Sequence, residues 1–151
     1  MEYSHLQRQA AYMKKSLFDQ GYLNEQFYQL EELQDEDSPN FVEDMVTSCF
    51  RDSTRLLSNI EQVLEKCPPD FGKLDTYMHK FKGNTSSIGA SRVMNECTQF
   101  RECCDEENIE GCLKSFQKMK REHAVLRQKL ESYFQLLRQD GPVERAARAS
   151  N

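Results

Sequence analysis

The sequence predicts an all-α protein, an antiparallel four-helix bundle with two additional N-terminal helices. Its 151 residues include only six Gly and four Pro, and they are rich in Glu, Gln, Lys and Leu, which favour helices. Apolar residues recur every three or four positions, as on one face of a helix, and no segment alternates as a strand would. The length suits one domain, which we place at residues 1–139.

The first two predicted helices lie before residue 38. Residues 2–20 form the first, with one apolar face made by Tyr3, Leu6, Ala10, Met13 and Leu17. Gly21 supplies its C-cap. Asn24 is expected to cap a second, shorter helix that carries Phe27 and Leu30, and the acidic residues 35–37 end it.

A long third helix is predicted from Ser38-Pro39, with Pro39 at its first helical position, to about Lys66. Its near-heptad apolar spacing suits packing at a shallow angle in a bundle and comprises Val42, Met45, Cys49, Leu56, Ile60 and Val63. The run Cys67-Pro68-Pro69 ends it.

Three more helices complete the bundle. Asp70 is expected to cap the fourth, and Gly89 marks the turn into the fifth, whose buried face is Ala90, Val93, Cys97, Phe100 and Cys104. The sixth runs from about Ile109 to Gln139, with an apolar face of Ile109, Leu113, Phe116, Leu126, Leu130 and Leu137. Short connections make these helices antiparallel neighbours, and the first two pack at one end. Residues 140–151 are polar, and we predict a flexible C-terminal tail.

Composition excludes several classes of function. A net charge of −5 argues against a nucleic-acid partner. The N-terminus has no export-signal pattern and no apolar run approaches the length of a membrane span, so we expect a soluble intracellular protein. None of the six cysteines has the C-x-x-C spacing of a zinc site. We expect them to be reduced and structural.

The fourth predicted helix carries the candidate reactive residue, His79. At 100° per residue, His79 points about 130° away from the centre of the helix's apolar stripe, so it should face water. Lys82 and Gly83 follow at three and four residues, on neighbouring positions of the same face. His5 is expected on the surface, and His123 falls within an apolar stripe, where a hydrogen-bonded structural role is expected.

An exposed imidazole on a rigid helix can act as a nucleophile, most plausibly through Nε2. For a phosphoryl group, Lys82 would offset the negative charge and Gly83 would let a partner protein approach. Ser86 lies on the same face and would hydrogen-bond near the site. Hairpin geometry adds Gln99 and Arg101 as candidates to orient the imidazole or contact the phosphoryl group. On spacing alone, an ordinary solvated face with Gly83 as a packing accommodation is the simpler interpretation.

A family resemblance changes that balance. The run from His79 to Ala90, HKFKGNTSSIGA, resembles the H-Q-[LF]-K-G-S-S-[SA]-S-[IV]-G-A signature of plant histidine-containing phosphotransfer proteins. The resemblance extends over residues 16–23 and 97–101 and covers the chain to about Gln139. It implies that His79 is the phosphoacceptor, Lys82 the cation beside the phosphoryl group, and Gly83 the small residue that permits docking. Lys80 stands where Gln is usual and Asn84 where Ser is usual.

The resemblance implies a phosphorelay intermediate. It would take a phosphoryl group from a receiver aspartate of a sensor hybrid histidine kinase and pass it to response regulators, in cytokinin signalling, in the cytoplasm and nucleus. It would be a monomeric phosphocarrier and not an enzyme: the sequence has no ATP-binding glycine loop, and Mg²⁺ would be supplied by the receiver. The docking surface would surround His79 and include the second and third helices. Phe27 and Leu30 are candidate contacts, although packing onto the bundle explains these two residues equally well.

Two other interpretations stay open. A non-relaying module would bind receivers and compete with true carriers, like the family's pseudo-phosphotransfer members that lack the His. A metal-binding bundle is disfavoured, because the chain offers no matched Glu-x-x-His pair on facing helices.

Overall fold

The computed structural model describes residues 5–139, and that part of the chain contains six α-helices and no strand. The helices are α1 (His5–Asp19), α2 (Glu25–Leu33), α3 (Phe41–Leu64), α4 (Phe71–Ser86), α5 (Ser91–Asp105) and α6 (Ile109–Gln139). Two predicted regions, the flexible tail at 140–151 and the first helix before residue 5, lie outside the described residues.

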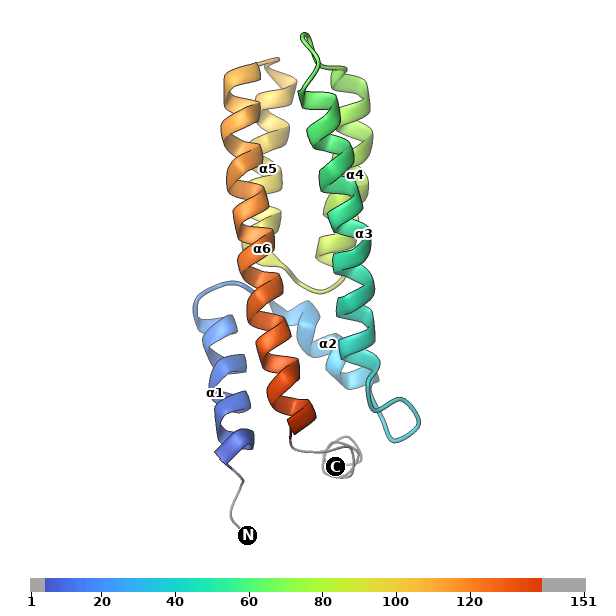
Figure 1. Ribbon diagram of the computed structural model, residues 1–151, viewed down its shortest axis with the longest axis vertical. Helices are drawn as coiled ribbons and strands as arrows, with labels where there is room; N and C mark the ends of the chain where they lie inside the picture. Colours follow the sequence, from blue (N-terminus) through green and yellow to red (C-terminus); the bar gives the residue numbers. More distant parts are fainter. Residues whose placement is uncertain (1–4, 140–151) are drawn as a thin grey trace.

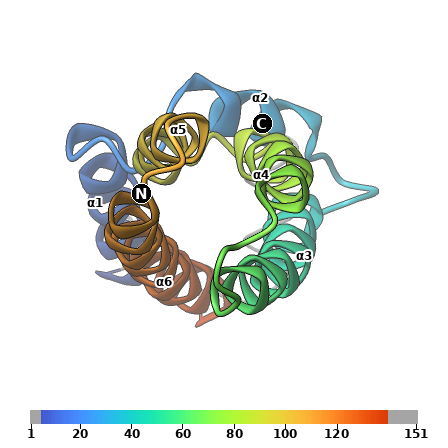
Figure 2. The ribbon, with the colours of Figure 1, turned by 90° about the horizontal axis from the view of Figure 1, so that it is seen from above.

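Helices α3 to α6 form the four-helix bundle, and they surround one core when seen along its axis (Figure 2). Helices α4 and α5 are shorter than α3 and α6 and lie beside only one half of them (Figure 1). The other half is covered by α1, which packs along α6, and by α2, which packs against α3. The predicted bundle with two additional N-terminal helices at one end is confirmed.

The turn after α4 is fixed to the connection between α1 and α2. Gly89 has a φ of +74°, which favours glycine, and a Cβ there would lie 2.4 Å from the Asn24 Oδ1. The Asn24 amide donates to the Gly89 carbonyl at 2.9 Å, and the Ser91 amide donates to the Tyr22 carbonyl at 3.1 Å. These contacts hold the C-terminal end of α4 against the N-terminal segment.

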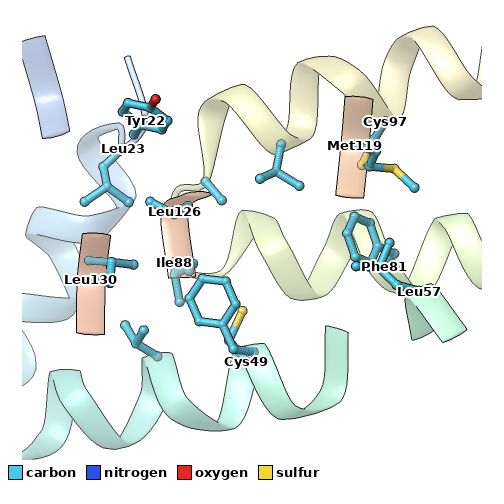
Figure 3. Close-up of a cluster of buried hydrophobic side chains, with 14 of the residues drawn as sticks. Tyr22, Leu23, Cys49, Leu57, Phe81, Ile88, Cys97, Met119, Leu126 and Leu130 are labelled. Atoms are coloured by element: carbon cyan, nitrogen blue, oxygen red, sulfur yellow. The ribbon is translucent and has the colours of Figure 1, made fainter. Parts of the chain in front are cut away.

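The core is apolar and draws side chains from every helix of the bundle (Figure 3). His123 of α6 is one of the buried polar residues, and we predicted its structural role: it is 4% exposed and its Nε2 lies 2.7 Å from the Ser53 Oγ. The rings of Phe50 and Phe81 pack against it. Burial lowers the pKa of His123 to about 4, and the positive charge of Arg127 adds to that effect. His123 is therefore a neutral structural residue.

Helix boundaries agree with the sequence except at the start of α3. The Asn24 and Asp70 side chains accept hydrogen bonds from the first turns of α2 and α4, as predicted. The prediction that Pro39 is the first residue of α3 is wrong, because Asn40 is the N-cap and the helix begins at Phe41. The Asp35 carboxylate accepts from the amides of Asp37 and Ser38, and this local turn delays the helix.

In α3 and α6 some buried residues are the sequence neighbours of those predicted to face the core. Ile109 and Leu113 are 37% and 45% exposed, so their predicted core positions are wrong. Cys112 is buried instead, because Phe116, Met119 and His123 continue its stripe at helical spacing and Leu113 points about 100° away from it. In α3, Met45 and Leu56 are half-buried while their neighbours Val46 and Leu57 face the core.

The cysteines are all free thiols, as predicted. Four of them are buried in the bundle: Cys49, Cys97, Cys104 and Cys112. Burial raises the pKa of Cys49 to about 12, so its thiol stays protonated. Among the described helices, none has a stretch both long and apolar enough to cross a bilayer.

Candidate functional site

His79 lies on the exposed side of α4. The residues Leu74, Met78 and Phe81 fill the opposite side and are fully buried, which fixes the rotation of the helix. The His79 side chain is exposed and forms no hydrogen bond or ion pair with residues 5–139. Its two ring nitrogens are therefore free to react or to be bound by a partner, which confirms the predicted orientation.

Lys82 supplies a positive charge on one side of His79. Its side chain is half-buried, and within the described chain it forms no ion pair. Burial raises the pKa of the Cys97 thiol to about 12, and the charges of Lys82 and Arg101 partly oppose that rise. Lys82 of α4 and Arg101 of α5 therefore both lie near Cys97, where the two helices pack together.

Gly83 has no packing reason within the described structure. A Cβ at this position would meet no other atom within 4 Å, and the backbone is ordinary α-helix. The interpretation of Gly83 as a packing accommodation is therefore wrong. A glycine in a helix interior costs about 1 kcal/mol relative to alanine, so the open space beside His79 is obtained at the expense of stability.

The Ser86 side chain lies against the helix on the same face and does not project into solvent. Its Oγ donates to the Gly83 carbonyl at 2.9 Å, so the side chain is folded back onto the helix. The hydroxyl oxygen can still accept a hydrogen bond. A partner protein that contacts His79 could therefore approach the helix backbone closely at Gly83 and Ser86.

The two departures from the family motif point in different directions. Asn84 faces α3, where its Oδ1 accepts a hydrogen bond from the Cys49 thiol at 2.9 Å. It links two helices of the bundle and does not face the His79 surface. Lys80 is exposed and has no ion-pair partner among residues 5–139, so it adds a second free positive charge next to His79.

The two candidates on α5, Arg101 and Gln99, leave the helix in nearly opposite directions. Arg101 reaches α4, where its Nη2 lies 3.5 Å from the Asp75 Oδ1. Asp75 is one helical turn before His79, and sequence reasoning missed it, although the four-residue spacing from His79 was a usable signal. Gln99 is exposed and points about 200° away from Arg101 around α5. The structure thus brings Arg101, and not Gln99, to the side of α4.

Of the two roles open for the apolar residues of α2, packing onto the bundle is confirmed and the docking role is wrong. Phe27 is fully buried and Leu30 is 5% exposed, because both pack into the core. The large hydrophobic side chains that α2 presents to solvent are Tyr28, whose ring stacks on Phe18 at 4.2 Å, and Leu33, which is 63% exposed.

The described residues hold no cluster of three or more His, Cys, Asp or Glu side chains able to bind a metal. A surface groove of about 900 Å³ lies between α1 and α6, and His79 does not line it. His79 lies on an exposed helix face, and because small molecules bind in concave pockets, such a face suits a protein partner better.

Comparisons with known proteins agree with this geometry. Residues 44–144 match the family model described as Hpt domain. The chain is 66% identical to pseudo histidine-containing phosphotransfer protein 5 of Oryza sativa, over 98% of this chain and 97% of that protein. It is 60% identical to histidine-containing phosphotransfer protein 4 of Arabidopsis thaliana, over 77% of this chain and 91% of that protein.

Solved structures show the same fold. The histidine-containing phosphotransfer protein of Medicago truncatula superposes with a TM-score of 0.85 at 40% identity, covering 90% of this chain and 92% of that one. The maize protein gives a TM-score of 0.84 at 37% identity, covering 89% of this chain and 98% of that one.

Proposed function

The chain belongs to the Hpt-domain family of histidine-containing phosphotransfer proteins, and from this premise we propose that it is a relay intermediate in a multistep phosphorelay. The observation that carries the proposal is His79 itself. Among residues 5–139 its imidazole is exposed and has no partner, Lys82 is a cation without an ion pair one turn away, and Gly83 leaves open space beside it.

In the proposed reaction, His79 Nε2 attacks the phosphorus of an aspartyl phosphate on the receiver domain of a sensor hybrid histidine kinase. The P–N bond forms as the P–O bond to the aspartate breaks, and the free carboxylate leaves. Transfer to a response regulator reverses these steps on a second aspartate. Such phosphoryl transfers depend on positioning and on charge neutralisation, and Lys82 provides the cation from this chain.

The remaining site residues act in docking. Gly83 and the folded-back Ser86 let the receiver approach the helix backbone, and Arg101 lies within one helical turn of the reacting face. Gln99 is the weaker candidate for this role because it points to another side of α5. The chain needs no cofactor of its own, and Mg²⁺ is supplied by the receiver.

The cellular setting is also part of the proposal. The plant relatives and the motif from His79 to Ala90 support a place between sensor kinases and response regulators of cytokinin signalling. The protein would act as a monomeric phosphocarrier without kinase activity, in the cytoplasm and the nucleus.

The direct test is phosphorylation by a receiver. The purified chain is mixed with a phosphorylated receiver domain, and acid-labile, alkali-stable phosphate on the chain is measured. The wild type should gain it and His79→Gln should not, although both should have the same helical content. Equal phosphate on the two proteins would show that His79 is not the acceptor.

A second candidate function is a receiver-binding protein that does not relay. Relatives from rice that are 66% and 63% identical carry the name pseudo histidine-containing phosphotransfer protein, which favours this reading of the chain. It predicts that the wild type binds a receiver and gains no phosphate from it. The presence of His79 favours the relay.

A further inference from the structure

The ion pair between Asp75 and Arg101 lies beside the reactive face of α4, and the function proposed above gives Asp75 no role. We propose that it is a charge-exchange device: Arg101 pairs with Asp75 while His79 is unmodified, and moves to the phosphoryl group once His79 carries one. The inference rests on the proposed phosphorylation of His79 and adds Asp75 as a residue that limits the lifetime of the phosphohistidine.

The geometry places the three groups together. Asp75 precedes His79 by four residues, so the two side chains start about 40° apart on the same face of α4. Arg101 reaches this face from α5, with its Nη2 at 3.5 Å from the Asp75 Oδ1. One helical turn, about 5.4 Å, separates the level of Asp75 from the level of His79, and this is within the reach of a rotating arginine side chain.

The pair is weak enough to be exchanged. It has a single N–O contact, and the side chains of Arg101 and Asp75 are 39% and 63% exposed. Exposed pairs of this kind contribute little to stability, because water and salt screen them. A phosphoryl group carries about two negative charges and can accept both prongs of a guanidinium. Arg101 should therefore prefer the phosphoryl group to the Asp75 carboxylate.

The exchange would change how long the phosphoryl group stays on His79. Without a receiver, loss of the phosphoryl group to water passes through a loose, metaphosphate-like transition state. As the P–N bond breaks, the phosphoryl oxygens donate electron density to phosphorus, and a cation bound to those oxygens opposes that donation. A nearby cation stabilises the starting phosphohistidine more than that transition state, and so slows hydrolysis. Arg101 should lengthen the lifetime. Asp75 should shorten it, both by repulsion and by competing for Arg101.

The experiment loads the full chain without a receiver. Phosphoramidate donates its phosphoryl group to the His79 imidazole: the P–N bond to ammonia breaks, a P–N bond to the ring forms, and ammonia leaves with the proton. The half-life of the acid-labile phosphate is then followed at neutral pH by ³¹P NMR. The variants are Asp75→Asn, Arg101→Gln, Arg101→Lys and the double variant Asp75→Asn/Arg101→Gln.

A matched control is the exposed ion pair of Glu110 and Lys114 on α6, whose contact is 3.4 Å. Glu110→Gln and Lys114→Gln remove the same charges from an exposed pair within another helix. They should leave the half-life unchanged. Far-ultraviolet circular dichroism checks that every variant keeps its helices.

Arg101→Gln should shorten the half-life about threefold and Asp75→Asn should lengthen it about twofold, magnitudes typical of exposed charges. Arg101→Lys should recover part of the loss. Asp75→Asn should have a smaller effect when Arg101 is already Gln, because the competition is gone. The proposal is overturned if Arg101→Gln leaves the half-life unchanged, if Asp75→Asn acts equally in both backgrounds, or if phosphoramidate loads no phosphoryl group on His79. If the variants show these half-lives but the wild type takes no phosphate from any receiver, the proposed relay function is refuted and the exchange of Arg101 between Asp75 and the phosphoryl group is still supported.

Discussion

Replacing Gly83 with alanine should make the protein more stable and less able to accept a phosphoryl group. A Cβ at Gly83 would meet no atom within 4 Å, and the residue has ordinary helical geometry, so the new methyl group causes no strain. Alanine is favoured over glycine in a helix interior by about 0.5–1 kcal/mol. The whole of that difference should appear as added stability, because nothing in the described structure opposes it.

Urea denaturation followed by circular dichroism measures the gain. With a slope of about 2 kcal/mol per molar urea, the midpoint should rise by about 0.3–0.5 M. Gly21→Ala is the matched control: its Cβ would also be free of contacts, but its φ of +76° is unfavourable for alanine, so this variant should lose stability.

Phosphate uptake from a phosphorylated receiver measures the functional cost. The methyl group stands where the receiver must approach His79, so the rate of uptake by Gly83→Ala should fall about tenfold or more. Loading by phosphoramidate, which is small, should be nearly unchanged. The reasoning is refuted if Gly83→Ala lowers the urea midpoint, or if it takes phosphate from the receiver as fast as the wild type.

Three further outcomes follow from the described side chains. The folded-state pKa of His123 is lowered to about 4 from 6.5, so the unfolded chain binds more protons between these values, and stability that is fully present above pH 6.5 should be lost as the pH falls toward 4. The free energy of unfolding should fall by about 3 kcal/mol because of this residue. Between pH 7 and 4.5 the urea midpoint should therefore fall less for His123→Asn than for the wild type, and an equal fall in the two proteins would contradict this prediction. Alkylation with iodoacetamide at pH 7.5 should modify the exposed Cys67 first and the buried Cys97 only on unfolding, and equal rates by peptide mass spectrometry would contradict the buried assignment. Lys80→Gln should change the salt dependence of receiver binding, because it removes a charge that is unpaired within residues 5–139 and lies beside His79. Asn84→Ser should lower the urea midpoint and leave receiver binding unchanged, because Asn84 bonds to Cys49 on α3. The opposite pattern in a binding titration would refute this division.

The helices themselves could be predicted because their signals are local. The caps at Asn24 and Asp70, the positive φ at Gly89 and the outward direction of His79 follow from residue type and a 3.6-residue period. The errors occurred where neighbours decide. Leu113 and Cys112 are both apolar, and they precede Phe116 by three and four residues, so spacing from Phe116 alone permits either. In the structure Cys112 is the buried one, and its Sγ lies 3.5 Å from the Cys104 Sγ of α5.

The candidate site shows the same division. Lys82 and Gly83 are on the helix of His79, so their spacing was sufficient to place them. Asp75 lies on the same helix, so its spacing from His79 could have been used, but its partner Arg101 is 26 positions away on another helix. Arg101 and Gln99 lie at the same level of α5, beside His79 in a helical hairpin, but their side chains leave the helix in different directions, and only Arg101 reaches α4.

The central claim, that this chain relays phosphoryl groups through His79, is tested most directly by a two-receiver experiment. A phosphorylated receiver domain and a second, unphosphorylated one are mixed with the chain, and phosphate on the second receiver is followed over time. The account predicts that phosphate reaches the second receiver with the wild type, and that none reaches it with His79→Gln. It would be contradicted if the wild type binds both receivers and the second one gains no phosphate.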